Sequence, residues 1–237
     1  MIFSKASLAG VGIIQRDKQI PVLNNVLFCK DGVIVVGCRN IFVAIEPVPY
    51  AISSQLHLES TPLTEDVLLS GENVKRLFSM IPSDTKFKGY LEYFDMTFSK
   101  PIGKVVVNFF DGIQDHRVIF GKVDLNYFTV NKIFGDILQS IESGSYKEID
   151  CRIRINLSRL SLVLSVIKNI TGDKSGEIPV YLCICKGGQT TNLFFKTKNP
   201  ATGQDIVAVS GLVGIQETEW VKKGKIERKF IKHKAKV

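Results

Sequence analysis

The chain has 237 residues, of which 45% are hydrophobic and 23% are charged. This is an ordinary globular composition, so wholesale disorder is excluded, and the length suits one large domain or two small ones. The sequence contains no run of 18 apolar residues and no charged-then-apolar leader. It therefore predicts neither a membrane span nor a secretory signal, and the expected location is the cytoplasm.

The formal net charge of +8 is concentrated at the C-terminal end of the chain. Residues 222–237 carry eight basic residues and one acid, a local balance of +7, so the remainder of the chain is only +1. The basic residues of this tail are Lys222, Lys223, Lys225, Arg228, Lys229, Lys232, Lys234 and Lys236. Such a tail is typical of an arm that contacts nucleic acid or an acidic partner, and a merely solvated tail is the alternative.

The first elements predicted are a short strand from Met1 to Phe3 and a helix that Ser4 caps and that continues to about Gln15. Strands follow from Asn25 to Lys30 and from Val33 to Cys38, joined by the turn residues Asp31 and Gly32. A third strand is expected from Ile41 to Val48, which gives a helix followed by an antiparallel meander.

A second stretch has the same order of elements. The apolar run Val67 to Leu69 leads into Ser70, which can cap a helix that ends at Pro82. The apolar positions of this helix lie at i, i+3, i+4 and i+7, which predicts one buried stripe formed by Val74, Leu77, Phe78 and Ile81. Further strands are expected at Gly89 to Phe94, Met96 to Ser99 and Lys104 to Phe110, before a turn at Asp111-Gly112.

A third stretch repeats this pattern after residue 150. A strand from Cys151 to Ile155 precedes two candidate caps, Asn156 and Ser158, and strands are expected near 180–186, 192–197 and 205–209. The helix between them has an apolar stripe at Leu160, Val163, Leu164 and Ile167, offset by 86 residues from the earlier stripe at all four positions. This offset indicates a repeated supersecondary unit, although any two amphipathic helices can be aligned on their stripes.

Motifs for catalysis or metal binding are not found. The sequence has no Gly-x-Ser-x-Gly elbow, Walker loop or Gly-x-Gly-x-x-Gly fingerprint, and Cys183 and Cys185 have no second ligand pair at metal-binding spacing. We expect the five cysteines to be buried, reduced thiols. We therefore expect a protein that is not an enzyme and needs no metal or cofactor. The alternative is an enzyme that uses the loop acids Asp111 and Asp115, although such carboxylates usually form turns.

Two strings carry a resemblance to a known family. IPVLNNVLFCKDGVIVVGCRNIFVAI, from Ile20 to Ile45, resembles the first domain of bacterial-type DNA sliding clamps. In that domain a proline-leucine stretch enters a strand, a glycine turn follows, and the third strand starts after a Thr-Asp/Asn pair, for which this chain has Arg39-Asn40. SGENVKRLFSMIPSDTKFKGYLEYFDMTFSK, from Ser70 to Lys100, is similar to the clamp helix that ends in a Leu-Pro or Ile-Pro step. The resemblance is good over residues 1–120 and weak over 150–215.

The resemblance implies an α+β protein with the DNA-clamp fold, made of repeated helix-plus-antiparallel-sheet units in two lobes. The corresponding division of the chain is a first clamp-like domain at 1–120, a connector or reduced half-unit at 121–150, a shortened second domain at 151–221 and the basic tail at 222–237. Clamp rings contain six domains, with helices lining a hole and strands outside. A homotrimer is therefore favoured and a dimer is possible, although this chain holds one full domain and little more than half of a second.

The implied function is that of a processivity factor in DNA replication, from a phage or other mobile element, which encircles double-stranded DNA and tethers a DNA polymerase after a clamp loader has placed it. The candidate DNA-binding residues are Lys5, Arg16, Lys18, Lys75, Arg76, Arg159, Lys168, Lys222, Lys223, Lys225, Arg228 and Lys229. Leu125 and Phe128 are candidates for a partner pocket, with core packing as the alternative. The alternative function is a clamp-fold accessory protein without a ring, which binds nucleic acid or a replication protein through its basic tail.

Overall fold

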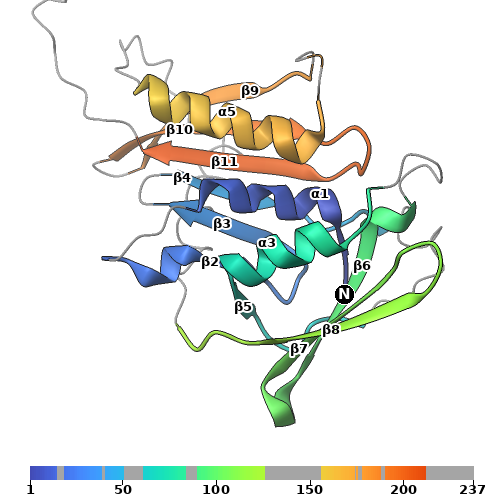
Figure 1. The fold of residues 1–237 in the computed structure, drawn as a ribbon. Coiled ribbons are helices and arrows are strands. Elements are labelled where there is room, and N and C mark those ends of the chain that lie inside the picture. Colours follow the sequence, from blue (N-terminus) through green and yellow to red (C-terminus); the bar gives the residue numbers. More distant parts are fainter. Residues whose placement is uncertain are drawn as a thin grey trace, which may run out of the picture.

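The structure is a computed structural model that describes residues 1–14, 19–38, 41–50, 61–83, 90–125, 156–173, 175, 178–187 and 190–211. These residues form an α+β arrangement in which every strand pair is antiparallel. Figure 1 shows helices lying across one face of a long sheet, with a smaller sheet beside them.

The larger sheet has seven strands in the order β5-β2-β3-β4-β11-β10-β9. It joins strands from both ends of the described chain, because β4 pairs with β11 and sets Val43 opposite Ala208. Its strands are β2 (Asn25–Phe28), β3 (Ile34–Cys38), β4 (Ile41–Ile45), β5 (Val67–Ser70), β9 (Tyr181–Gly187), β10 (Thr190–Lys198) and β11 (Asp205–Gly211).

The smaller sheet has four strands in the order β1-β6-β7-β8. These strands are β1 (Ile2–Ser4), β6 (Tyr93–Ser99), β7 (Lys104–Phe110) and β8 (Asp115–Gly121). In the described part of the chain, β8 pairs with β7 alone and is therefore an edge of this sheet.

Side-chain caps fix the start of each helix. The Ser4 hydroxyl accepts from the Ser7 amide at the start of α1 (Lys5–Leu8), and Ser70 does the same for Asn73 at the start of α3 (Gly71–Met80). The Asn156 side chain accepts hydrogen bonds from the amides of Ser158 and Arg159 at the start of α5 (Leu157–Thr171). Each cap satisfies backbone donors that the helix itself leaves unpaired, so these short polar residues determine where the helices begin.

Short 3-10 segments complete the secondary structure. The first helix continues from α1 into η1 (Ala9–Ile13), and the other three segments are η2 (Pro21–Asn24), η3 (Tyr90–Glu92) and η4 (Lys100–Ile102). Gly10 in η1 permits close packing, because a Cβ atom there would lie 3.0 Å from Val36 Cγ1 and 3.6 Å from Ile170 Cδ1. The first helix can therefore approach both β3 and α5.

In the described part of the chain, a helix followed by three antiparallel strands occurs three times, and we call each occurrence a unit together with any described strand that leads into its helix. The first unit is β1, α1 with η1, β2, β3 and β4; the second is β5, α3, β6, β7 and β8; the third is α5, β9, β10 and β11. The first two units exchange their leading strands, since β1 pairs with β6 of the second unit and β5 pairs with β2 of the first. The two helices α3 and α5 begin at Gly71 and Leu157, the offset of 86 residues that the sequence predicts.

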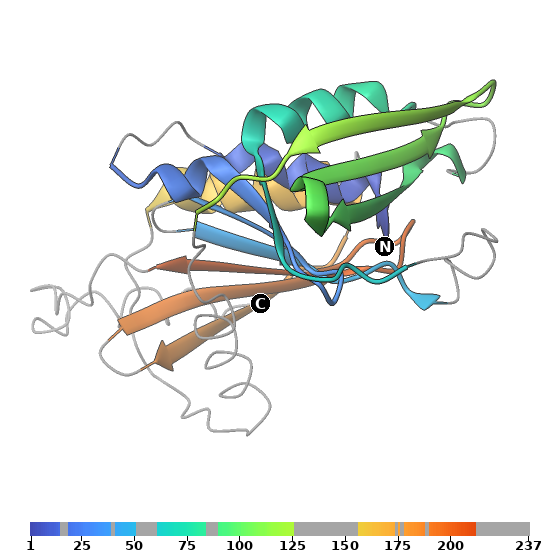
Figure 2. The same ribbon diagram turned by 90° about the horizontal axis from the view of Figure 1, so that it is seen from below.

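One apolar core joins the two sheets and the helices. The aromatic side chain of Phe3 on β1 contacts Phe28 on β2 edge to face, at 5.3 Å between ring centroids, and stacks on Phe94 of β6 at 5.7 Å. The same buried cluster includes Leu77 of α3 and Ile167 of α5. Figure 2 shows that α1, α3 and α5 lie on the same side of the larger sheet.

A buried polar network connects the first unit to the third. Gln204, before β11, accepts hydrogen bonds through Oε1 from the hydroxyls of Ser4 at 2.7 Å and Ser7 at 3.2 Å. Its Nε2 donates to the Glu46 carbonyl oxygen at 2.7 Å. Because Ser4, Ser7 and Gln204 are all buried, these bonds specify how the two units meet.

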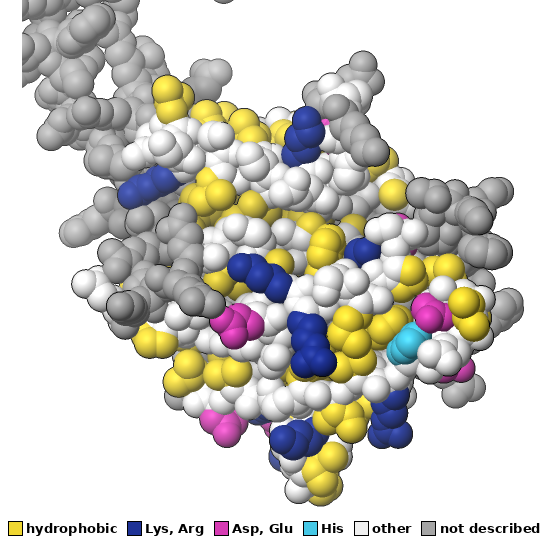
Figure 3. All heavy atoms as spheres, viewed as in Figure 1, with side chains coloured by type: hydrophobic (Ala, Val, Ile, Leu, Met, Phe, Trp, Pro, Cys, Tyr) yellow, Lys and Arg dark blue, Asp and Glu magenta, His cyan; other side chains and the backbone are white. Residues whose placement is uncertain are grey.

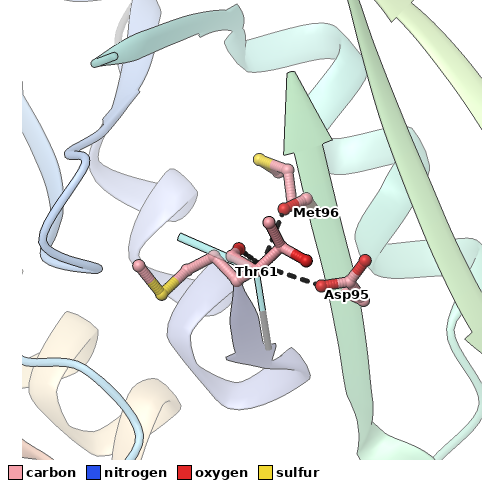
Figure 4. A network of polar contacts seen from close by, with 4 residues as sticks. Thr61, Asp95 and Met96 are labelled. Atoms are coloured by element: carbon pink, nitrogen blue, oxygen red, sulfur yellow. Dashed lines mark hydrogen bonds and ion pairs between the residues drawn. The ribbon is translucent and has the colours of Figure 1, made fainter. Parts of the chain in front are cut away.

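The amino terminus is held in the smaller sheet (Figure 4). The Met1 ammonium donates to Asp95 Oδ1 at 2.8 Å, to the Met96 carbonyl oxygen at 3.0 Å and to the Thr61 carbonyl oxygen at 2.5 Å. These contacts fix β1 against β6, so they support the strand exchange between the first and second units.

Several sequence predictions need correction. The strands expected at Gly89 to Phe94 and Met96 to Ser99 are one strand, β6, and the return strand β8 was not predicted. In α5 the predicted stripe is partly wrong, because Leu164 is 42% exposed while Val166 and Ile170 are buried. Because α5 continues to Thr171, Ile170 extends the buried stripe by a turn, and the buried face is centred on Val163, Ile167 and Ile170.

Candidate nucleic-acid interface

The helix face of the molecule, formed by α1, α3 and α5 on the side away from the seven-stranded sheet, carries most of the predicted DNA-binding residues that the structure describes. Figure 3 views this face and shows Lys and Arg side chains distributed over it with few acidic side chains between them. The elements are amphipathic, so the apolar stripe that fixes each helix on the sheet also turns its polar side chains outward.

Lys75 and Arg76 are the basic residues of α3, and both are exposed. Val74 and Leu77, their immediate neighbours, are fully buried and fix the rotation of the helix. Glu72, in the first turn, is the one acid of α3. A net positive helix surface of this kind can contact phosphate groups without reading base sequence.

The outward face of α5 combines one basic residue with hydroxyls. Lys168 is exposed on this face, whereas Arg159 is only partly exposed and lies four residues before the buried Val163, on the other side of the helix. The helix contains no acidic residue. Ser161 and Ser165 are exposed on the same face, where hydroxyls can donate to phosphate oxygens. Leu162, which follows Ser161, packs partly against the core.

Lys5 makes intramolecular contacts between α1 and α3. Its ammonium donates to the Ser83 hydroxyl at 2.8 Å and lies 5.0 Å from the centroid of the Phe78 ring. Burial lowers the pKa of Lys5 from its ordinary value, with the Glu92 carboxylate opposing that shift. Lys5 therefore connects two helices of the face and contributes less free positive charge than Lys75 or Arg76.

The face also has apolar positions that the sequence did not single out. Leu157 and Leu164 lie seven residues apart on α5 and are 77% and 42% exposed. Because seven residues are about two helical turns, both leucines belong to one stripe. The outward side of α5 therefore presents exposed leucine side chains as well as polar ones.

Some predicted site residues lie outside the described residues. They are Arg16, Lys18, Phe128 and the tail residues Lys222, Lys223, Lys225, Arg228 and Lys229. Leu125 is described and is exposed at the end of the segment that follows β8. In that segment the Val123 amide donates to the Leu68 carbonyl oxygen at 2.8 Å, which guides the chain along β5.

The loop acid Asp111 organises the hairpin between β7 and β8. Its Oδ1 accepts from the amides of Ile113 at 2.8 Å and Gln114 at 2.9 Å, and its Oδ2 lies 2.5 Å from His116 Nε2. The Gln114 amide, the His116 side chain and the Ile113 amide together lower the pKa of Asp111 to about 2. The His116 ring also stacks on Phe109 at 5.0 Å, so these groups fix a turn as expected of a carboxylate beside glycine.

The described residues contain no group of three or more His, Cys, Asp or Glu side chains that could hold a metal ion. The thiol of Cys29 is free, and burial, with Asp66 and Asp31 nearby, raises the pKa of Cys29 to about 12. Such a thiol stays protonated and unreactive at neutral pH. In the same described part of the chain, no helix has the combined length and apolar character needed to cross a bilayer.

The sequence matches no protein-family model and no curated protein.

Proposed function

We propose that this protein is a cytoplasmic, DNA sliding-clamp-like processivity factor that forms a homo-oligomeric ring around double-stranded DNA and tethers a DNA polymerase. The arrangement of the three units carries the proposal. Each has a helix followed by three antiparallel strands, and all three helices lie on one side of the seven-stranded sheet (Figure 2). The sliding-clamp resemblance implies this separation, with helices toward DNA and sheets outside.

The distribution of charge on the helix face supports the same function. Lys75, Arg76 and Lys168 are exposed there, and Glu72 is the one acid in α3 and α5 together. Three to five basic groups neutralise few phosphates, so electrostatic affinity for duplex DNA would be low and strongly reduced by salt. A protein that encircles DNA tolerates low affinity, because a closed ring cannot leave an uninterrupted circle and can still slide.

The sheet edges support oligomerisation. β8 is an open edge in the described chain, whereas β4, the last strand of the first unit, pairs with β11, the last strand of the third. An edge strand presents unpaired backbone groups that another chain can use. β8 is the last strand of the second unit, and the last strands of the other two units, β4 and β11, pair with each other and make the larger sheet continuous. We therefore expect β8 to pair with a strand of another chain in the same way.

The test is retention of the protein on closed circular duplex DNA, before and after a single cut that linearises the circle. We expect retention on circles at a salt concentration that removes simple electrostatic binders, and rapid loss after linearisation. Equal behaviour on both DNA forms would contradict the proposal. A variant lacking residues 222–237 separates this function from the alternative, which is nucleic-acid binding through the basic tail. Retention by a ring should survive the deletion, whereas binding through the tail should be lost.

The helix face is tested by charge removal. Replacing Lys75, Arg76 and Lys168 with serine should lower the slope of log affinity against log salt by up to about three for linear DNA, since each lost phosphate contact contributes about 0.9. The matched control replaces three exposed lysines of the strands and hairpins, Lys30, Lys104 and Lys198, which should leave the slope unchanged. An equal effect of both triple variants would show that the helix face has no special role.

A further inference from the structure

The open edge of the smaller sheet, strand β8, carries two opposite charges and exposed isoleucines. In the described chain β8 pairs with β7 alone, and exposed residues alternate with partly or fully buried ones along it. Asp115 and Arg117 are exposed and lie two residues apart, so their side chains point to the same face of the sheet. Ile119, further along that face, is 55% exposed, and Ile113, in the turn before β8, is 90% exposed. Such an edge is suited to pairing with another strand.

The hydrogen-bond alternation in the hairpin directs every second backbone amide of β8 to the open edge. The Asp111 amide donates to the Gln114 carbonyl oxygen at 3.2 Å, which sets the first bonded position between the two strands. Bonded positions of an antiparallel ladder recur at every second residue, so His116 is bonded to β7. The amides of Asp115 and Arg117 therefore point away from β7, toward the edge that a partner strand would use.

The chain itself contains a junction between the last strands of two units. β4 and β11 pair antiparallel, with Val43 opposite Ala208. The helices of the same two units also meet, because a Cβ atom at Gly10 of η1 would lie 3.6 Å from Ile170 Cδ1 of α5. β8 is the last strand of the second unit, and the described chain has no further last strand to pair with it. A second copy of the chain supplies such a strand in its own β8.

We propose that β8 pairs antiparallel with β8 of a second copy, about a twofold axis that passes beside His116. This register sets Asp115 of each strand opposite Arg117 of the other, and opposite charges on facing strands stabilise a pair. The same register brings Ile113 of each copy toward Ile119 of the other. The contact is isologous, because both copies use the same strand. Its role in a ring rests on the proposed function, whereas the pairing itself is measured without DNA.

Neighbouring registers are less favourable for physical reasons. An axis at Arg117 would place this residue opposite its own copy, and like charges on facing strands are destabilising. An axis at Val118 would extend the pairing to Gly121, at the end of β8. Beyond this end the Val123 amide donates to the Leu68 carbonyl oxygen of β5 at 2.8 Å, so β5 occupies the outward side of the chain there. The first part of β8, which holds the two charges, is therefore the part that a partner strand can reach.

Sedimentation equilibrium of the full-length protein tests the pairing by charge reversal. We expect wild type to form at least dimers, and Asp115→Arg or Arg117→Asp alone to raise the dissociation constant about tenfold or more, because both facing pairs become like-charged. An equimolar mixture of the two variants restores opposite charges across the junction and should restore association. Mixing cannot repair a contact within one chain, so this recovery identifies pairing between copies. Lys198→Asp, at an exposed position of β10, is the matched control and should associate like wild type.

Amide exchange measured by NMR gives a reading without a variant. The Arg117 amide should exchange slowly in concentrated wild-type protein and quickly after dilution to monomer. The Val118 amide, which the alternation directs to β7, should stay protected at both concentrations and serves as the internal control. Exchange at Arg117 that does not depend on concentration would overturn the pairing, as would a wild-type monomer or trimer, or a mixture that stays as dissociated as its two components.

These readings separate the pairing from the ring function. Protein that is retained on circular DNA while its Arg117 amide exchanges quickly would overturn the pairing and leave the proposed function standing. Protein that associates through β8 but leaves circular and linear DNA equally fast would support the pairing and contradict the proposed function.

Discussion

The first two units and the third unit have the same order of helix and strands but differ in completeness. In the first two units, β1 pairs with β6 and β5 pairs with β2, so the strand that follows each helix has a neighbouring strand on both sides. In the third unit, β9 has a described neighbour on one side only. The comparison indicates that a unit of one helix and three strands does not close its own sheet and depends on a second unit to do so.

The crossing strand β1 offers the strongest test of this dependence. Phe3 is fully buried and contacts Phe28 of the first unit and Phe94 of the second. Phe3→Ala should lower the free energy of unfolding by about 3–5 kcal/mol, because it removes buried area and leaves a cavity where both units meet. Urea unfolding provides the measurement.

Leu164→Ala on the outward face of α5 is the control for this change. Since Leu164 is partly exposed, we expect a change of about 0.5 kcal/mol or less. If Phe3→Ala were equally mild, the exchange of β1 would not be important for stability.

The contact between the first and third units depends on Gln204. Gln204→Ala should lower the free energy of unfolding by about 1–3 kcal/mol, because the Ser4 and Ser7 hydroxyls and the Glu46 carbonyl each lose a buried partner. Hydrogen exchange should rise in residues 190–211 more than in β6 and β7.

Thr202→Val gives a matched control two residues away. Thr202 Oγ1 is buried without a hydrogen-bond partner, so replacing the hydroxyl by a methyl group should be neutral or stabilising. A uniform rise of exchange over the whole molecule in Gln204→Ala would contradict a local role for this network.

The smallest effect concerns the β8 edge. Folding lowers the pKa of Asp111 from 3.8 to about 2, so its ionised form stabilises the hairpin at pH values above 3.8. That contribution is lost as pH falls from 3.8 through 2. The difference in thermal stability between wild type and Asp111→Asn should therefore be full at pH 5 and absent below pH 2.

Gln114→Ala tests the specificity of this pH dependence. The change removes a side chain from the same turn but keeps the backbone amide that donates to Asp111. The thermal stability of Gln114→Ala should depend on pH in the same way as that of wild type. If the thermal stability of Asp111→Asn also followed the wild-type pH dependence, the carboxylate would not fix the hairpin.

Local elements were predictable where a short polar residue caps a helix or glycine makes a turn. Ser4, Ser70 and Asn156 cap the predicted helices, and Gly32 adopts the predicted turn with a φ of 92°. The helix faces were less predictable. In α5, a leucine-rich sequence allows several stripes, and contact with η1 and the sheet selects one of them.

The pairing of strands that lie far apart in the chain could not be predicted from a single sequence. Nothing local in Ile2–Ser4 specifies pairing with β6, about 90 residues away, because register depends on the assembled core. The role of Lys5 was missed for the same reason, since Ser83 and Phe78 reach it only after α1 and α3 pack. The exposure of Lys75 and Arg76 followed directly from the buried stripe beside them.

The central claim is that the helix face surrounds the duplex, and site-specific photocrosslinking tests it most directly. A photoreactive amino acid would replace Ser79 on α3 or Ser161 on α5, both exposed on the helix face. The control position is Lys198 on β10, on the opposite side of the sheet from Leu193 and Phe195. Protein retained on circular DNA should crosslink from Ser79 and Ser161 but not from Lys198, and crosslinks from Lys198 alone would contradict the account.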